Sequence, residues 1–144
     1  MLAALTMSAV ALASCEQSER GTAVAGLCPD FKAAAAAGDP AGPVDNCVKR
    51  WAYTLAGGKD AADVVADAVV AACGAPLSTW NQAALVNQTD GAEATSIITG
   101  QPTTPMAEHY GFAQSHALLY VVQARAGRCA APPVKDGTPV GVTP

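Results

Sequence analysis

Two segments in the middle of the chain repeat apolar residues at helical spacing. In PVDNCVKRWAYTLA and in DAADVVADAVVAAC, apolar side chains recur every three or four residues. This period places them on one side of an α-helix, so that side is expected to face the core. The two predicted inward stripes are Val44, Cys47, Val48, Trp51, Ala52 and Leu55 in the first segment, and Val64, Val65, Ala68, Val69, Ala72 and Cys73 in the second.

The residues around these segments indicate where each helix starts and stops. The GGK at 57–59 separates the two segments, and Gly74 and Pro76 follow the second one. Asp60 is placed to cap the second helix, and Asp63 would lie in its first turn, where a carboxylate is favoured. The pattern therefore predicts an antiparallel αα-hairpin over residues 44–73.

Further helices are predicted on both sides of the hairpin. PDFKAAAAA predicts a short helix over 29–37, and residues 77–88 predict a third helix whose inward residues are Trp80, Ala84 and Leu85. Residues 92–98 are expected to form a loop with one helical turn. Thr104 and Pro105 open the longest helix, over 105–126, and Gly127 ends it. Its expected inward face is Met106, Tyr110, Ala113, Ala117, Tyr120, Val121 and Ala124.

The only β-like run is SIIT, which is too short to build a sheet. The predicted fold class is therefore all-α, a small bundle of four to five helices. With 144 residues, the chain is long enough for one domain.

The beginning of the chain indicates export. Residues 1–14 carry no charged side chain, and the polar stretch CEQSER follows directly. An apolar run of this length that ends in small residues is typical of a signal peptide. Leu12, Ala13, Ser14 and Cys15 resemble the lipobox of bacterial lipoproteins. This resemblance implies removal of residues 1–14, a lipid on Cys15, and a location in the cell envelope, anchored to the membrane and facing the periplasm.

Two alternatives for this segment remain open. Ala11 and Ala13 also fit an ordinary signal-peptidase site, which would release a soluble secreted protein, and a cytosolic apolar helix is the third reading.

The number of cysteines favours the lipoprotein reading. The chain has five cysteines, and a lipid on Cys15 leaves four, an even number that is able to form two disulfides. Cys47 and Cys73 lie at similar distances on either side of the GGK break, so the antiparallel hairpin brings them to the same height. The sequence therefore predicts a Cys47–Cys73 disulfide and, by elimination, a Cys28–Cys129 disulfide.

Composition divides the remainder of the chain. Residues 15–27 are polar and glycine-punctuated and are expected to be a tether, residues 28–129 form the helical domain, and the Pro- and Gly-rich residues 130–144 are expected to be disordered. The net charge of −4 gives no basic surface for nucleic acid. No apolar run reaches the ~20 residues that a membrane-spanning helix needs.

The strongest candidate chemistry lies in EHYGFAQSHALLY, which contains Glu108, His109, Ser115 and His116. The two histidines are about two helical turns apart, too far to chelate one metal ion side by side. Ser115 and His116 are neighbours on a helix, so their side chains diverge and cannot act as nucleophile and base. We expect a half-buried polar seam and treat these four residues as a candidate binding surface, with no catalytic residue, metal site or cofactor assigned.

The aspartates of the second predicted helix, Asp60, Asp63 and Asp67, are expected to form a solvated face. The preferred hypothesis is a non-enzymatic binding module that captures an envelope component. The alternatives are a metal-binding protein or enzyme using Glu108, His109 and His116, and a structural spacer of the envelope.

Overall fold

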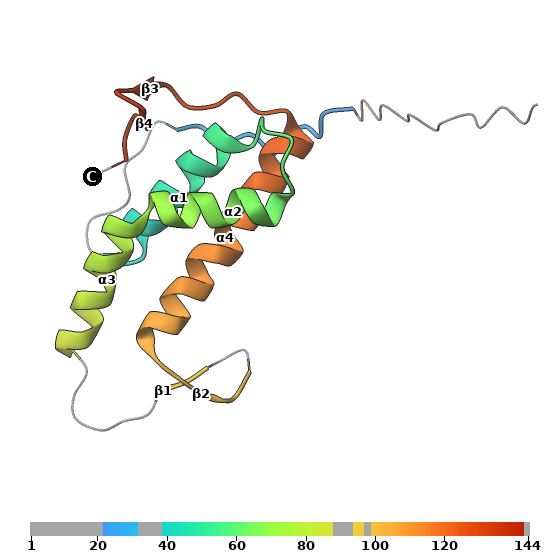
Figure 1. The fold of residues 1–144 in the computed structure, drawn as a ribbon. Coiled ribbons are helices and arrows are strands. Elements are labelled where there is room, and N and C mark those ends of the chain that lie inside the picture. The colour runs from blue at the N-terminus through green and yellow to red at the C-terminus, as the bar shows by residue number, and fades with distance from the viewer. Residues whose placement is uncertain (1–21, 32–38, 88–93, 97–98, 143–144) are drawn as a thin grey trace, which may run out of the picture.

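The computed structural model describes residues 22–31, 39–87, 94–96 and 99–142 (Figure 1). Within these residues there are four helices: α1 (Gly42–Leu55), α2 (Ala62–Ala72), α3 (Gly74–Asn87) and α4 (Pro105–Gly127). Two antiparallel pairs of two-residue strands accompany them, β1 (Ala94–Thr95) with β2 (Pro102–Thr103) and β3 (Val134–Lys135) with β4 (Thr138–Pro139). The predicted all-α class is confirmed. The predicted signal peptide, Cys15 and most of the predicted helix over 29–37 lie outside the described residues.

The core lies where α4 packs against α1 and α2. Its buried side chains are almost all valine, alanine and cysteine: Val44, Cys47, Val48, Ala52, Val65, Ala66, Val69, Val70, Cys73, Ala113, Ala117 and Val121. Small side chains let helices approach closely, so the three helices enclose a continuous core without large side chains at its centre.

The inward face of α2 differs from the prediction. Val65, Ala66, Val69 and Val70 are buried, whereas Val64 is 55% exposed and Ala68 and Ala72 are exposed. The physical reason is that DVVADAVVAA is apolar on most of its circumference, so two neighbouring stripes satisfy the helical period equally well. Contacts with α1 and α4 select one of them.

The two ends of α2 also differ from those predicted from the sequence. Ala61 rather than Asp60 is the N-cap, and no side chain caps the helix, although Asp63 does lie in the first turn. Gly74 ends α2 but begins α3 at once, with a bend of 66° between the two helix axes. Pro76 fits into the first turn of α3, because the N–H groups there need no helical partner.

Both ends of α4 are set by local contacts. Its predicted start is confirmed, since the Thr104 hydroxyl accepts a hydrogen bond from the Ala107 N–H at 3.2 Å. At the other end Gly127 still belongs to the helix, and Arg128 takes the left-handed conformation with φ 51°.

The inward face of α4 is only partly as predicted. Ala113, Ala117, Val121 and Ala124 are buried, but Met106 and Tyr110 are 53% and 51% exposed. Figure 1 shows the reason: the first half of α4 extends beyond α1 and α2, beside α3.

Two disulfides join the expected cysteines. The Cα atoms of Cys47 and Cys73 are 5.9 Å apart, which ties α1 to the end of α2. Those of Cys28 and Cys129 are 5.3 Å apart, which ties the segment before α1 to the end of α4. Gly127 is required beside this second disulfide, because a Cβ there would lie 2.6 Å from Cys129 Sγ.

The segments before and after the predicted domain also pack against it. Residues 130–142 were expected to be disordered, but β3 and β4 form a hairpin whose turn residues Asp136 and Gly137 both have positive φ. Val140 and Gly141 accept hydrogen bonds from side chains of α1. Within the predicted tether, the Val24 N–H donates to Ala126 O. The described unit therefore extends beyond residues 28–129 at both ends.

No single helix in the described ranges is long and apolar enough to cross a membrane. Helices α2 and α3 taken together, with the bend between them, reach that length and composition.

Candidate functional site

A line of half-exposed rings runs along one side of α4. His109, Phe112, His116 and Tyr120 are spaced by three or four residues, so they share one helix face. Trp80 of α3 lies against its first members: its ring stacks on His109 with centroids 3.6 Å apart and contacts Phe112 edge-on at 5.4 Å. These five side chains are called the ring seam below.

The contacts continue along the seam. The centroids of Phe112 and His116 are 3.9 Å apart, and those of His116 and Tyr120 are 5.8 Å apart. Tyr120 is in turn 6.5 Å from the buried Tyr53, which meets Phe31 edge-on. Both histidines and five of the seven Phe, Tyr and Trp residues thus form one line.

Asp45 joins α1 to the middle of the ring seam. It lies in the first turn of α1, where the helix dipole favours a carboxylate. Its Oδ1 is 2.7 Å from His116 Nδ1 and accepts a hydrogen bond from the Tyr120 hydroxyl, also at 2.7 Å. Burial, followed by this bond and the charge of Asp45, raises the pKa of Tyr120, so Tyr120 stays protonated as a donor. The side chains of His116 and Asp45 remain 33% and 34% exposed, within reach of a ligand.

His109 is held at the other end of the seam. Its Nδ1 is 2.7 Å from Asn81 Oδ1, and its ring lies flat on Trp80. Burial lowers the pKa of His109, and the neighbouring charge of Glu108 opposes that shift. The lowered pKa favours the neutral imidazole, whose other ring nitrogen offers one further hydrogen-bonding group.

Of the four residues that the sequence singled out, the two histidines belong to the ring seam and the other two do not. His109 and His116 both belong to the ring seam, whereas the Ser115 hydroxyl donates back to Phe112 O on its own helix at 3.0 Å. Glu108 acts on the seam through its charge near His109. Across the described ranges, no three His, Cys, Asp or Glu side chains lie close enough to hold a metal ion.

Sequence reasoning missed the partners of the two histidines. Asp45, Asn81 and Trp80 come from α1 and α3, and only the fold brings them to α4. One signal was available: the 109, 112, 116, 120 spacing places four rings on one helix face.

The surface beside the seam carries no charged side chain over long stretches. No Asp, Glu, Lys or Arg occurs in residues 68–89 or in residues 109–124. On α3 and α4 these stretches expose large apolar side chains, namely Leu85, Val86, Tyr110, Leu118, Leu119 and Val122. Exposed large apolar side chains such as these are available to an interaction partner.

Comparison of the chain with models of protein families, with curated proteins and with solved structures found no match.

Proposed function

We propose that this chain is a lipid-anchored protein of the cell envelope that works by binding, and that the ring seam, together with the exposed Leu119 on the same face of α4, is the binding surface. The lipobox-like residues before Cys15 support the location. The two disulfides also fit it, because disulfides persist in oxidising compartments.

The observation that carries the binding proposal is the exposure of the ring seam. Aromatic side chains supply large apolar contact area at little cost in conformational entropy and are enriched at binding surfaces. Here their edges are accompanied by hydrogen-bonding groups that the fold already orients, in His116, Asp45 and Asn81. A rigid apolar surface with few fixed polar groups favours recognition of a partner over chemical catalysis.

The contacts of the polar groups favour the same reading. Catalysis by a serine would need its hydroxyl beside a histidine, but Ser115 bonds to its own helix. The imidazoles instead pack in the line of rings and bond to neighbouring helices. We infer that the histidines shape the surface and offer hydrogen bonds to a protein partner in the envelope.

The experiment compares two adjacent leucines on α4. Leu119 lies one helical turn beyond His116 and two turns beyond Phe112, on the face of the seam, whereas Leu118 is rotated about 100° away. Both are exposed, so an aspartate at either position leaves the core unchanged. The mature protein is used to capture a partner from a detergent-solubilised envelope extract, and the purified partner is then titrated against the Leu119→Asp and Leu118→Asp variants.

We expect Leu119→Asp to weaken binding about tenfold or more and Leu118→Asp to change it by about twofold or less, because a buried unpaired charge is costly at an interface centre. Equal effects of the two variants would place the contact elsewhere. An extract from which the protein retains no saturable partner would contradict the binding function itself.

The proposed location has its own test. The intact mass of protein from a bacterial host should show a diacyl or triacyl increment on Cys15, and four thiols should appear only after reduction. An unprocessed chain with five free thiols would overturn the lipoprotein proposal.

A further inference from the structure

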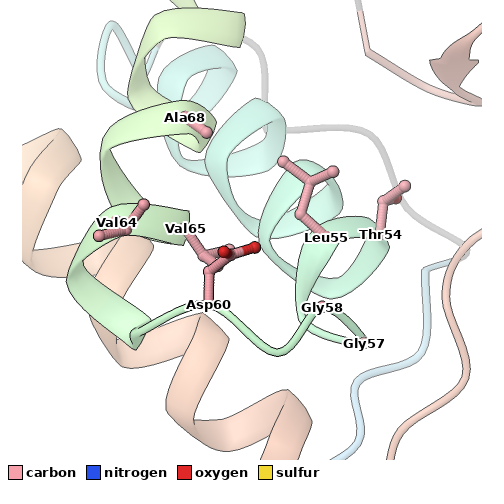
Figure 2. A pocket seen from close by; sticks show the side chains of 8 residues that line it. All are labelled: Thr54, Leu55, Gly57, Gly58, Asp60, Val64, Val65 and Ala68. Carbon is pink, nitrogen blue, oxygen red and sulfur yellow. The ribbon is translucent and has the colours of Figure 1, made fainter.

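A pocket lies at the opposite end of α1 from Asp45, at the turn between α1 and α2 (Figure 2). It is an open pocket of about 380 Å³, within the ~300–1,000 Å³ range of small-molecule sites. Its apolar wall is Leu55, Val64, Val65 and Ala68, and its rim is Thr54, Gly57, Gly58 and Asp60.

The apolar wall exposes a side chain that core packing does not use. Val64 follows the exposed Asp63 and is 55% exposed, although Val65 beside it is buried. Leu55 packs against the core and still lines the pocket. The wall therefore offers branched side chains from both helices to an apolar group of modest size.

The rim carries one carboxylate, that of Asp60. Although Asp60 stands just before α2, it does not cap that helix, and it makes no side-chain hydrogen bond or ion pair within the part of the chain that the structure describes. Figure 2 shows the carboxylate rising from the turn towards the space between Leu55 and Val65. Its Oδ2 lies 3.5 Å from the position that a Cβ on Gly58 would take, so Gly58 borders this oxygen without a side chain of its own.

The backbone of the turn that carries Asp60 is held by a side chain of α4. Arg125 of α4 donates to the main-chain oxygens of Ala56, Gly58 and Asp60, at 3.0, 3.2 and 2.8 Å. Arg125 thus fixes the backbone of the turn and leaves the carboxylate of Asp60 unpaired.

We propose that this pocket binds a small organic ammonium compound, with its apolar body against Leu55, Val64 and Val65 and its ammonium group at the Asp60 carboxylate. An anionic ligand would be repelled by Asp60, and a neutral apolar ligand would leave the carboxylate partly desolvated without a partner. The site is separate from the ring seam, so this inference is independent of the proposed function.

The test uses n-hexylammonium chloride as the probe, with the mature protein labelled with ¹⁵N. The amide signals of Gly57 and Gly58 report on the rim, and hexan-1-ol and hexanoate are the neutral and anionic comparisons. Asp60→Asn removes the carboxylate charge, and Asp63→Asn is the matched control, because Asp63 is exposed in the first turn of α2, three residues further along, and does not line the pocket.

We expect saturable shifts of both glycine signals with a Kd of about 1 mM or tighter for hexylammonium. Affinity should be about fivefold higher than for hexanol, an advantage that Asp60→Asn removes and Asp63→Asn keeps. Ala68→Phe should abolish binding by filling the pocket, whereas Ala71→Phe, at an exposed position outside it, should not. The inference is overturned by the absence of saturation, by equal affinity for the three probes, or by an unchanged preference in Asp60→Asn.

Discussion

Arg50 of α1 is hydrogen-bonded to both the segment before α1 and the segment after the β3–β4 hairpin. It is only 6% exposed, and its guanidinium donates to Phe31 O before α1 and to Val140 O after the β3–β4 hairpin, at 2.9 and 2.6 Å. Its Nε donates to Asn46 Oδ1 at 2.9 Å on the same helix. Replacing Arg50 by Met keeps an unbranched apolar stem in place and removes all three donors.

The size of the effect follows from these contacts. A hydrogen bond to a charged group contributes about 1.5–3 kcal/mol net. The bond to Asn46 joins neighbours on one helix surface and can be replaced by water. Only the bonds to Phe31 O and Val140 O are therefore included in the expected loss of stability. The carbonyl of the exposed Val140 also regains water when the terminal segment detaches. We therefore expect Arg50→Met to lower the free energy of unfolding by about 3 kcal/mol.

The assay is urea unfolding followed by far-UV circular dichroism, together with amide exchange of Val140, whose N–H donates to Pro133 O in the terminal hairpin. Lys135→Met is the control, because it removes an exposed cation from the same hairpin, and its effect should stay within about 0.5 kcal/mol. If Arg50→Met stays within about 1 kcal/mol of the wild type and Val140 exchanges no faster, the attachment does not depend on Arg50.

Three further predictions concern glycine, the disulfides and histidine. Gly127→Ala should destabilise the fold by about 1–3 kcal/mol, since its Cβ would overlap Cys129 Sγ, whereas Gly111→Ala should stabilise it by about 0.5–1 kcal/mol in open space; thermal melts that rank them the other way would refute this. Replacing both cysteines of the Cys28–Cys129 disulfide should lower the free energy of unfolding by about 4.7 kcal/mol, because this disulfide closes a loop of 101 residues. Replacing those of the Cys47–Cys73 disulfide, which closes a loop of 26 residues, should lower it by about 3.5 kcal/mol. Urea unfolding that gave the reverse order would show that loop closure does not dominate. Because burial lowers the pKa of His109 in the folded state, the unfolded chain takes up that proton first as the pH falls, so stability should decline from about pH 6.5 downward. His109→Gln should flatten that decline, and an unchanged pH profile would contradict the assignment.

The features predicted correctly from the sequence were those that local chemistry decides. The start of α4 follows from Thr104 and Pro105, which act within one turn of the helix. The Cys47–Cys73 pairing follows from hairpin geometry, which depends only on the positions of the two cysteines relative to the turn.

The register of α2 and the order of the terminal segment were not predicted, for two different reasons. In α2 the apolar period is ambiguous, so the choice between Val64 and Ala66 depends on the neighbouring helices. In residues 130–142, high Pro and Gly content suggested disorder, but the Asp136–Gly137 pair is a hairpin signal, and the partners that hold the segment are Asn46 and Arg50, about ninety residues earlier in the chain.

The location of the ring seam has a physical cause in the alanine content of the core. Periodicity alone assigns the largest apolar residues to the interior, which led to the wrong expectation for Met106 and Tyr110. Where α1, α2 and α4 meet through alanine and valine, the helices lie too close to accept rings between them. Tyr53 is the one aromatic side chain buried in the described structure, and most of the others must lie along the helix edges. The same close packing that stabilises this small domain therefore places its rings and both histidines at the surface, where they are available to a partner.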